Sequence, residues 1–150
     1  MYNDVVAITN LLYLYAERVD AGDAAGVAAL FEDADVKWGV DAPVRHGSAA
    51  ILELYDTYIK LHDDGTPRTH HLITNPIIDI AEDGMSATAR SYYTVVQQTA
   101  MIPLQVIASG RYHDVLTKVD GAWRFAKRDY FMDMRGNVSD HVNIPPSSSQ

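Results

Sequence analysis

Histidines and carboxylates are the side chains of this chain with the clearest chemical potential. His70 and His71 are adjacent in a segment of strand-like pattern, so they point to opposite faces and only one enters a given cavity. His71 shares its face with Ile73 and Asn75. A histidine on the inner face of a sheet titrates near neutrality and acts as a general base when a carboxylate orients its ring. A hydrogen-bonded structural histidine is the alternative interpretation.

Asp20 is the natural partner for such a histidine. It lies at the C-terminal end of a predicted helix, where a carboxylate opposes the helix dipole. A residue placed against local preference indicates a functional cause, although an ordinary solvent-exposed aspartate is the alternative. Asp23 is better explained as the cap of the next helix.

Motifs for other chemistries are missing. The sequence contains no G-x-S-x-G, no G-x-x-x-x-G-K-[ST] and no G-x-G-x-x-G, so nothing supports a serine hydrolase, a nucleotide hydrolase or a dinucleotide-binding protein. There is no cysteine for thiolate chemistry or thiolate metal ligation. A metal site could draw on His62, Asp63, Asp64, His70 and His71, but their spacing matches no standard ligand pattern. We expect no metal and no cofactor.

Composition narrows the partners. The 150 residues, 47% hydrophobic and 21% charged, are typical of one globular domain. A formal net charge of −8 argues against a nucleic-acid partner or an anionic membrane surface. No signal-peptide pattern and no apolar run of about 20 residues is present, so we expect a cytoplasmic protein with no membrane partner.

The elements that must position these residues fall into a helical front half and a strand-rich back half. Apolar residues at three- and four-residue steps predict a first helix, capped by Asn3 or Asp4 and ending near Ala21. Two shorter helices follow, one over 24–31 and one that Ser48 caps and that extends to His62. A brief strand is predicted at 36–38 and a loop at 43–47. Strands are predicted at 69–80, 86–98, 104–118 and 122–132, with tight turns at Asp83-Gly84 and Asp120-Gly121.

This order predicts an α+β fold in which three helices pack on one curved antiparallel sheet. The domain spans 1–136, and 137–150 form a tail. Segments 92–96 and 106–108 are apolar on both strand faces, so we expect a second subunit to cover the outer face; burial within the monomer is the alternative. Val138, Val142 and Ile144 give the tail enough apolar surface to dock as a lid, against the alternative that it frays.

Three strings carry a resemblance to a known family: LYLYAERVDAGDAAGVAALFEDADVKW, HHLITNPIIDI and GRYHDVLTKVDGAWRFAKRDYF. In order and spacing, over about residues 3–135, the chain resembles the SnoaL-like branch of the nuclear-transport-factor-like superfamily. The resemblance implies a cone-shaped, cystatin-like α+β barrel whose open end holds a small apolar ligand. Within the branch it is most similar to scytalone dehydratases, hexachlorocyclohexane dehydrochlorinases and bile-acid 7α-dehydratases, and less to polyketide cyclases.

The resemblance also implies roles for residues. Asp20 matches the aspartate that orients the base, His71 the histidine base, Arg128 a pocket arginine and Tyr15 a pocket tyrosine. Trp38 lies near a pocket aromatic that several relatives share. The chain departs from two relatives. Scytalone dehydratases have a second histidine at the position that corresponds here to about Val96 or Gln97. Ketosteroid isomerases have a carboxylate on the first strand, where this chain has Lys37 and Trp38.

We therefore expect a cofactor-independent lyase, of dehydratase or dehydrohalogenase type, in which His71 removes a carbon-bound proton. Arg128 or Tyr15 would stabilise the developing negative charge. The alternatives are an isomerase or polyketide cyclase on the same cone, or a non-catalytic module that binds small ligands. The expected partners are a small hydrophobic or aromatic substrate and further copies of the chain, as a trimer or dimer. The predicted pocket wall comprises Tyr15, Trp38, Leu54, Tyr58, Ile73, Asn75, Tyr92, Val106 and Arg128.

Overall fold

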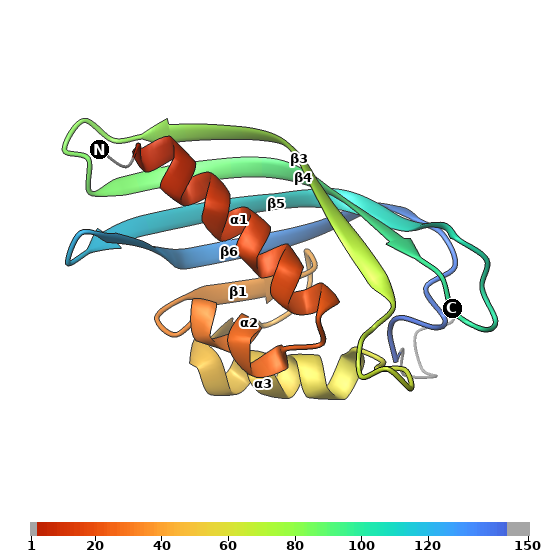
Figure 1. Cartoon of the computed structure of the whole chain (residues 1–150). Helices are drawn as coiled ribbons and strands as arrows, with labels where there is room; N and C mark the ends of the chain where they lie inside the picture. The colour runs from red at the N-terminus through yellow and green to blue at the C-terminus, as the bar shows by residue number, and fades with distance from the viewer. Residues whose placement is uncertain (1–2, 144–150) are drawn as a thin grey trace.

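The structure, a computed structural model, describes residues 3–143, which form three helices and one curved, unclosed sheet of six strands (Figure 1). The helices are α1 (Asp4–Asp20), α2 (Ala24–Leu30) and α3 (Gly47–Tyr58). The strands are β1 (Asp35–Trp38), β2 (Val44–His46), β3 (Thr69–Ile80), β4 (Ser86–Gln97), β5 (Gln105–Val119) and β6 (Ala122–Arg135). Their order across the sheet is β2-β1-β6-β5-β4-β3.

The predicted α+β architecture of three helices on a curved sheet is confirmed. Figure 1 shows α1 lying across the sheet, with α2 and α3 as a second group below β1. The side chain of Asn3 caps α1 by accepting a hydrogen bond from the Val5 N–H, and the helix buries Ile8, Leu12 and Val19 against the sheet. The predicted hairpin turns also form, with Gly84 and Gly121 at positive φ.

Four local predictions need correction. Residues 43–47 are not all loop, because β2 pairs there with β1. The sheet is not wholly antiparallel, since β1 lies parallel to β6. The third helix begins at Gly47 after His46, without the predicted Ser48 cap, and it ends at Tyr58, so His62 lies beyond it.

Bulges determine which strand residues face the helices. In the β5–β6 pairing, Leu116 is opposite Phe125 and Val115 is opposite Lys127, so Ala126 is an extra residue on β6. This bulge reverses the alternation and turns Arg128 inward, on the same face as Phe125. A similar shift in the β4–β5 pairing, next to Val95, makes Ile107 the extra residue of β5.

The outer face of the sheet carries exposed apolar side chains. Leu72, Tyr92 and Val106 are each about half exposed, and they lie on the paired strands β3, β4 and β5. An apolar surface of this kind is what the expected homo-oligomer would cover. The oligomer stays a prediction, which light scattering would check. Among the described residues, no helix is long and apolar enough to cross a membrane.

Candidate active site

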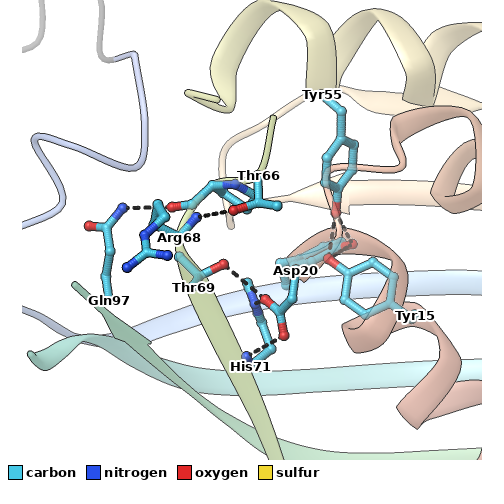
Figure 2. Close-up of polar contacts among 10 residues, drawn as sticks. Tyr15, Asp20, Tyr55, Thr66, Arg68, Thr69, His71 and Gln97 are labelled. Atoms are coloured by element: carbon cyan, nitrogen blue, oxygen red, sulfur yellow. Dashed lines mark hydrogen bonds and ion pairs between the residues drawn. The ribbon is translucent and has the colours of Figure 1, made fainter. Parts of the chain in front are cut away.

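The structure brings Asp20 and His71 together where the end of α1 meets the start of β3 (Figure 2). Asp20 Oδ1 lies 2.6 Å from His71 Nδ1, and Oδ2 accepts a hydrogen bond of 2.8 Å from the His71 backbone N–H. Thr69 Oγ1 donates a third hydrogen bond, of 2.9 Å, to Oδ1. These donors compensate for the unfavourable position of a carboxylate at a helix C-terminus.

This geometry sets the tautomer of His71. An ionised carboxylate only accepts hydrogen bonds, so Nδ1 carries the ring hydrogen and Nε2 is left as the acceptor. The imidazole is only 7% exposed. A ring oriented in this way, with a basic nitrogen turned away from its carboxylate, is equipped to remove a proton from a bound molecule.

The loop before β3 holds these residues in place. Arg68 has a positive φ of 59°, and its N–H donates to Thr66 Oγ1. Gln97 Nε2, from the end of β4, donates to the carbonyl of Pro67. Figure 2 shows these contacts on the opposite side of Asp20 from Tyr15 and Tyr55. The turn therefore enters β3 in one conformation, with Thr69 and His71 next to Asp20.

His71 lies on the wall of a narrow apolar pocket of about 50 Å³, which opens to solvent at its mouth. The rest of the wall is almost entirely aromatic and aliphatic. It is formed by Tyr15, Val19, Trp38, Tyr55, Ile59, Tyr93, Val95, Ala108, Tyr112, Tyr130, Met132, Val138, His141 and Val142. Such a cavity, with few polar groups, suits a small hydrophobic or aromatic molecule.

Three buried hydroxyl groups form a cluster in this pocket, which we call the tyrosine cluster: Tyr15, Tyr55 and Tyr130. Tyr130 donates to Tyr15 over 3.0 Å, and the hydroxyls of Tyr15 and Tyr55 are also hydrogen-bonded. The third contact, between Tyr55 and Tyr130, is long at 3.4 Å. Burial raises the pKa of Tyr15 and Tyr55 well above the usual value, so both keep their hydrogens. Because the contact between Tyr55 and Tyr130 is long, a ligand oxygen can compete for it.

Arg128 is not on the pocket wall, which corrects the prediction that it lines the pocket and meets the developing charge. It is fully buried, and its Nε and Nη2 donate to the two carboxylate oxygens of Asp114 over 2.7 and 2.8 Å. The guanidinium centre lies 4.0 Å from the ring centroid of Tyr112 and 4.4 Å from that of Tyr15. Arg128 therefore packs against the rings of two tyrosines of the pocket wall without lining the pocket itself.

Of the predicted wall residues, Tyr15 and Trp38 lie on the wall, and the others do not. The strand errors come from the choice of face: Tyr93 and Val95 point inward, whereas Tyr92 and Val106 lie on the outer face. Four more residues that were predicted on the wall lie outside it: Leu54, Tyr58, Ile73 and Asn75. In α3 it is Tyr55 that reaches the pocket, and Asn75, at a positive φ of 54°, sits in the irregular part of β3.

Sequence reasoning missed His141, which comes from the described part of the tail. Residues 136–143, here called the C-terminal segment, place Val138, His141 and Val142 on the pocket wall. His141 is 7% exposed, and its ring centroid is 6.0 Å from that of His71. The signal available in sequence was the pair of valines four residues apart with a histidine between them. Ile144 and the rest of the predicted lid lie outside the described residues.

His141 makes the stability of the protein sensitive to acid. Burial, reinforced by the nearby His71, lowers its pKa to about 4. The unfolded chain takes up this proton from about pH 6.5 downward and the folded chain does not, so the stabilisation is complete above pH 6.5 and is lost as the pH falls toward 4. The free energy of unfolding falls by up to about 3 kcal/mol for this reason.

We expect the free energy of unfolding of the wild type to fall more between pH 7 and pH 4.5 than that of His141→Gln. Urea unfolding at both pH values measures this. Equal falls in the two proteins would show that His141 is not held neutral.

Residues 3–143 contain no group of three or more histidine, cysteine, aspartate or glutamate side chains that could hold a metal ion. Two of the residues considered above as ligands make other contacts. His62 Nε2 contacts the Asp140 carbonyl, and Asp64 accepts from Thr66.

The chain is similar to several proteins of known structure. A protein of unknown function from Mycobacterium tuberculosis, Rv3472, is 30% identical over 91% of this chain and 75% of its own, with a TM-score of 0.70. A candidate scytalone dehydratase from Novosphingobium aromaticivorans is 25% identical over 98% of this chain and 95% of its own, with a TM-score of 0.71. No curated protein sequence matches the chain.

A third solved structure is similar in fold. An NTF2-like protein with a cystatin-like fold, also from Novosphingobium aromaticivorans, is 20% identical over 91% of this chain and 86% of its own, with a TM-score of 0.71. The model of the SnoaL-like domain matches residues 1–129, which include both Asp20 and His71. The chain therefore belongs to the SnoaL-like domain family.

Proposed function

We propose that the protein is a cofactor-independent lyase that removes water from a small aromatic or alicyclic hydroxy ketone. One observation carries the proposal: the 2.6 Å contact between His71 Nδ1 and Asp20 Oδ1 leaves a basic nitrogen on the wall of a pocket that also holds buried tyrosine hydroxyls. Base and hydrogen-bond donors thus share one apolar space. Similarity to a candidate scytalone dehydratase supports the same reaction class.

The reaction begins at the carbon next to the ketone. His71 Nε2 takes a proton from this carbon, and the electron pair moves toward the carbonyl oxygen, which a hydroxyl of the tyrosine cluster holds. Asp20 stabilises the imidazolium that forms. The C–O bond to the β-hydroxyl then breaks, and the proton on His71 goes to the departing oxygen. The products are the unsaturated ketone and one water molecule, and His71 returns to its neutral form.

The pocket favours this sequence of steps. Its wall is mostly aromatic and aliphatic, so hydrogen bonds to the developing enolate are stronger there than in water. The raised pKa of Tyr15 and Tyr55 keeps these phenols as donors throughout. The Asp20 carboxylate compensates for the cost of a charged imidazolium in such surroundings.

A suitable test is 3-hydroxy-1-tetralone, which loses water and becomes the fluorescent 1-naphthol. We expect the wild type to accelerate this conversion well above buffer and to keep its rate after treatment with a metal chelator. Release of 1-naphthol is followed by fluorescence and confirmed by mass spectrometry. Loss of the activity with the chelator would contradict the cofactor-independent mechanism. Binding of the ketone without turnover would identify a ligand-binding module.

A further inference from the structure

A second histidine faces the same pocket as His71 but comes from the other end of the chain. His141 is more than nine-tenths buried and lies on the pocket wall. Its Nδ1 has no hydrogen-bond partner among residues 3–143. A buried polar atom is normally satisfied, so one without a partner on a pocket wall is a place for a polar group of a bound molecule.

The C-terminal segment holds this histidine at a fixed position. The carbonyl of Asp140 accepts from Gln97 Nε2 over 3.0 Å and lies 2.9 Å from His62 Nε2. The carboxylate of Asp140 accepts from Thr99 over 2.6 Å, and the His141 carbonyl accepts from the Lys60 N–H over 2.9 Å. These contacts tie the segment both to the chain after α3 and to the end of β4. His141 is thus part of the wall, next to His71.

Burial keeps the ring of His141 neutral, because it lowers the pKa of the imidazole. The titratable groups that act on it are His71, Asp20 and His62, and burial is the largest influence on its pKa. A neutral imidazole offers one N–H donor and one acceptor nitrogen, and it does not compete with His71 for the proton that Asp20 stabilises. The two histidines therefore have different roles: His71 can take up a proton beside Asp20, and His141 stays neutral and can only hydrogen-bond.

We propose that His141 binds a hydroxyl oxygen of the substrate at the His71 end of the pocket, away from the oxygen held by the tyrosine cluster. This deepens the proposed function and rests on it for the identity of the reacting end. The substrate class is then a small ring system with two oxygens, a ketone at the tyrosines and a hydroxyl at the histidines. In the elimination, the His141 N–H donates to the departing oxygen, which receives its proton from His71, so His141 ends as it began.

Two unreactive compounds test the assignment by binding alone: 1,3-dihydroxynaphthalene has both oxygens, and 1-naphthol lacks the second. Calorimetric titration of the wild type should show about fivefold tighter binding of the dihydroxy compound, the size expected for one net hydrogen bond. In His141→Phe this preference should vanish, while 1-naphthol binds within about twofold of wild type. His141→Gln, which can still hydrogen-bond, should keep part of the preference.

His70→Phe is the matched control, because His70 is exposed on the neighbouring position of β3 and outside the pocket. It should leave the preference unchanged. An unchanged preference in His141→Phe, equal binding of the two compounds to wild type, or no binding of either would overturn the inference. The proposed function fails separately, by absence of turnover of 3-hydroxy-1-tetralone. A His141-dependent preference without turnover would leave the binding role in place and remove the lyase.

Discussion

Replacing Arg128 by methionine is expected to lower the free energy of unfolding by about 3–5 kcal/mol, because it leaves the carboxylate of Asp114 buried without its partner. Both side chains of this pair are fully buried, and Arg128 also packs on the rings of Tyr15 and Tyr112. Methionine keeps much of the length and apolar contact, so the loss reports the charge and not a cavity. Chemical denaturation at pH 7 measures it, and a fall in melting temperature by about 10 °C should accompany it.

The matched control is Arg111→Met. Arg111 also makes a two-point ion pair with an aspartate across β5 and β6, Asp133, but both side chains are more than a third exposed. Its loss should cost at most about 1 kcal/mol. The double variant Arg128→Met, Asp114→Leu should recover much of the stability, since it removes both charges. A cost below about 1 kcal/mol for Arg128→Met would show that the buried pair has solvent access or another compensating charge.

The parts of the fold that depend on local signals could be predicted from sequence. Apolar residues at three- and four-residue steps gave α1 almost to its ends, and Asp120-Gly121 gave the β5–β6 turn because its backbone needs positive φ. Runs of period two gave the long strands within a few residues of their ends. The short strand β2 carries no such pattern. It is a strand only because β1 lies beside it.

The errors on the strands of the pocket wall come from the assignment of faces. A strand residue is assigned to a face by counting in twos, and each bulge shifts the count by one. Ile107 shifts the count between Val106 and Ala108, so Ala108 is on the pocket wall and Val106 is not. A bulge is a property of two paired strands, so neither strand shows it alone. Choosing between Tyr92 and Tyr93 likewise needs the position of the helices.

His141 and the tyrosine cluster were missed for a different reason. Tyr15, Tyr55 and Tyr130 come from three elements far apart in the chain, and nothing in their spacing indicates that their hydroxyls meet. His141 reaches the pocket because its backbone and that of its neighbour are tied to Lys60 and Gln97. By contrast, Asp20 was conspicuous, because a carboxylate at a helix C-terminus needs donors from elsewhere, and it finds them on β3.

Replacing His71 by glutamine is expected to reduce kcat for 3-hydroxy-1-tetralone by about 10²–10⁴-fold, because glutamine keeps a hydrogen-bonding side chain and has no basic nitrogen. Asp20→Asn should approach the same loss although Asp20 is not on the pocket wall. An asparagine whose side-chain oxygen accepts from the backbone N–H of His71 turns its amide NH₂ toward the ring Nδ1 of His71. The ring hydrogen then moves to Nε2, which becomes a donor and no longer takes a proton.

The signature of Asp20→Asn is therefore a fall in kcat with KM changed by no more than a few-fold, together with a changed tautomer of His71 in ¹⁵N spectra of the imidazole. Thr69→Val is the matched control. It removes one of the three hydrogen bonds to Asp20 and leaves the contact with Nδ1 intact, so the rate should fall by no more than about tenfold. Circular dichroism and melting curves establish that each variant is folded. If folded Asp20→Asn kept more than about a tenth of the wild-type rate, the aspartate would not set the state of the base, and general base catalysis by His71 would have to be abandoned with it.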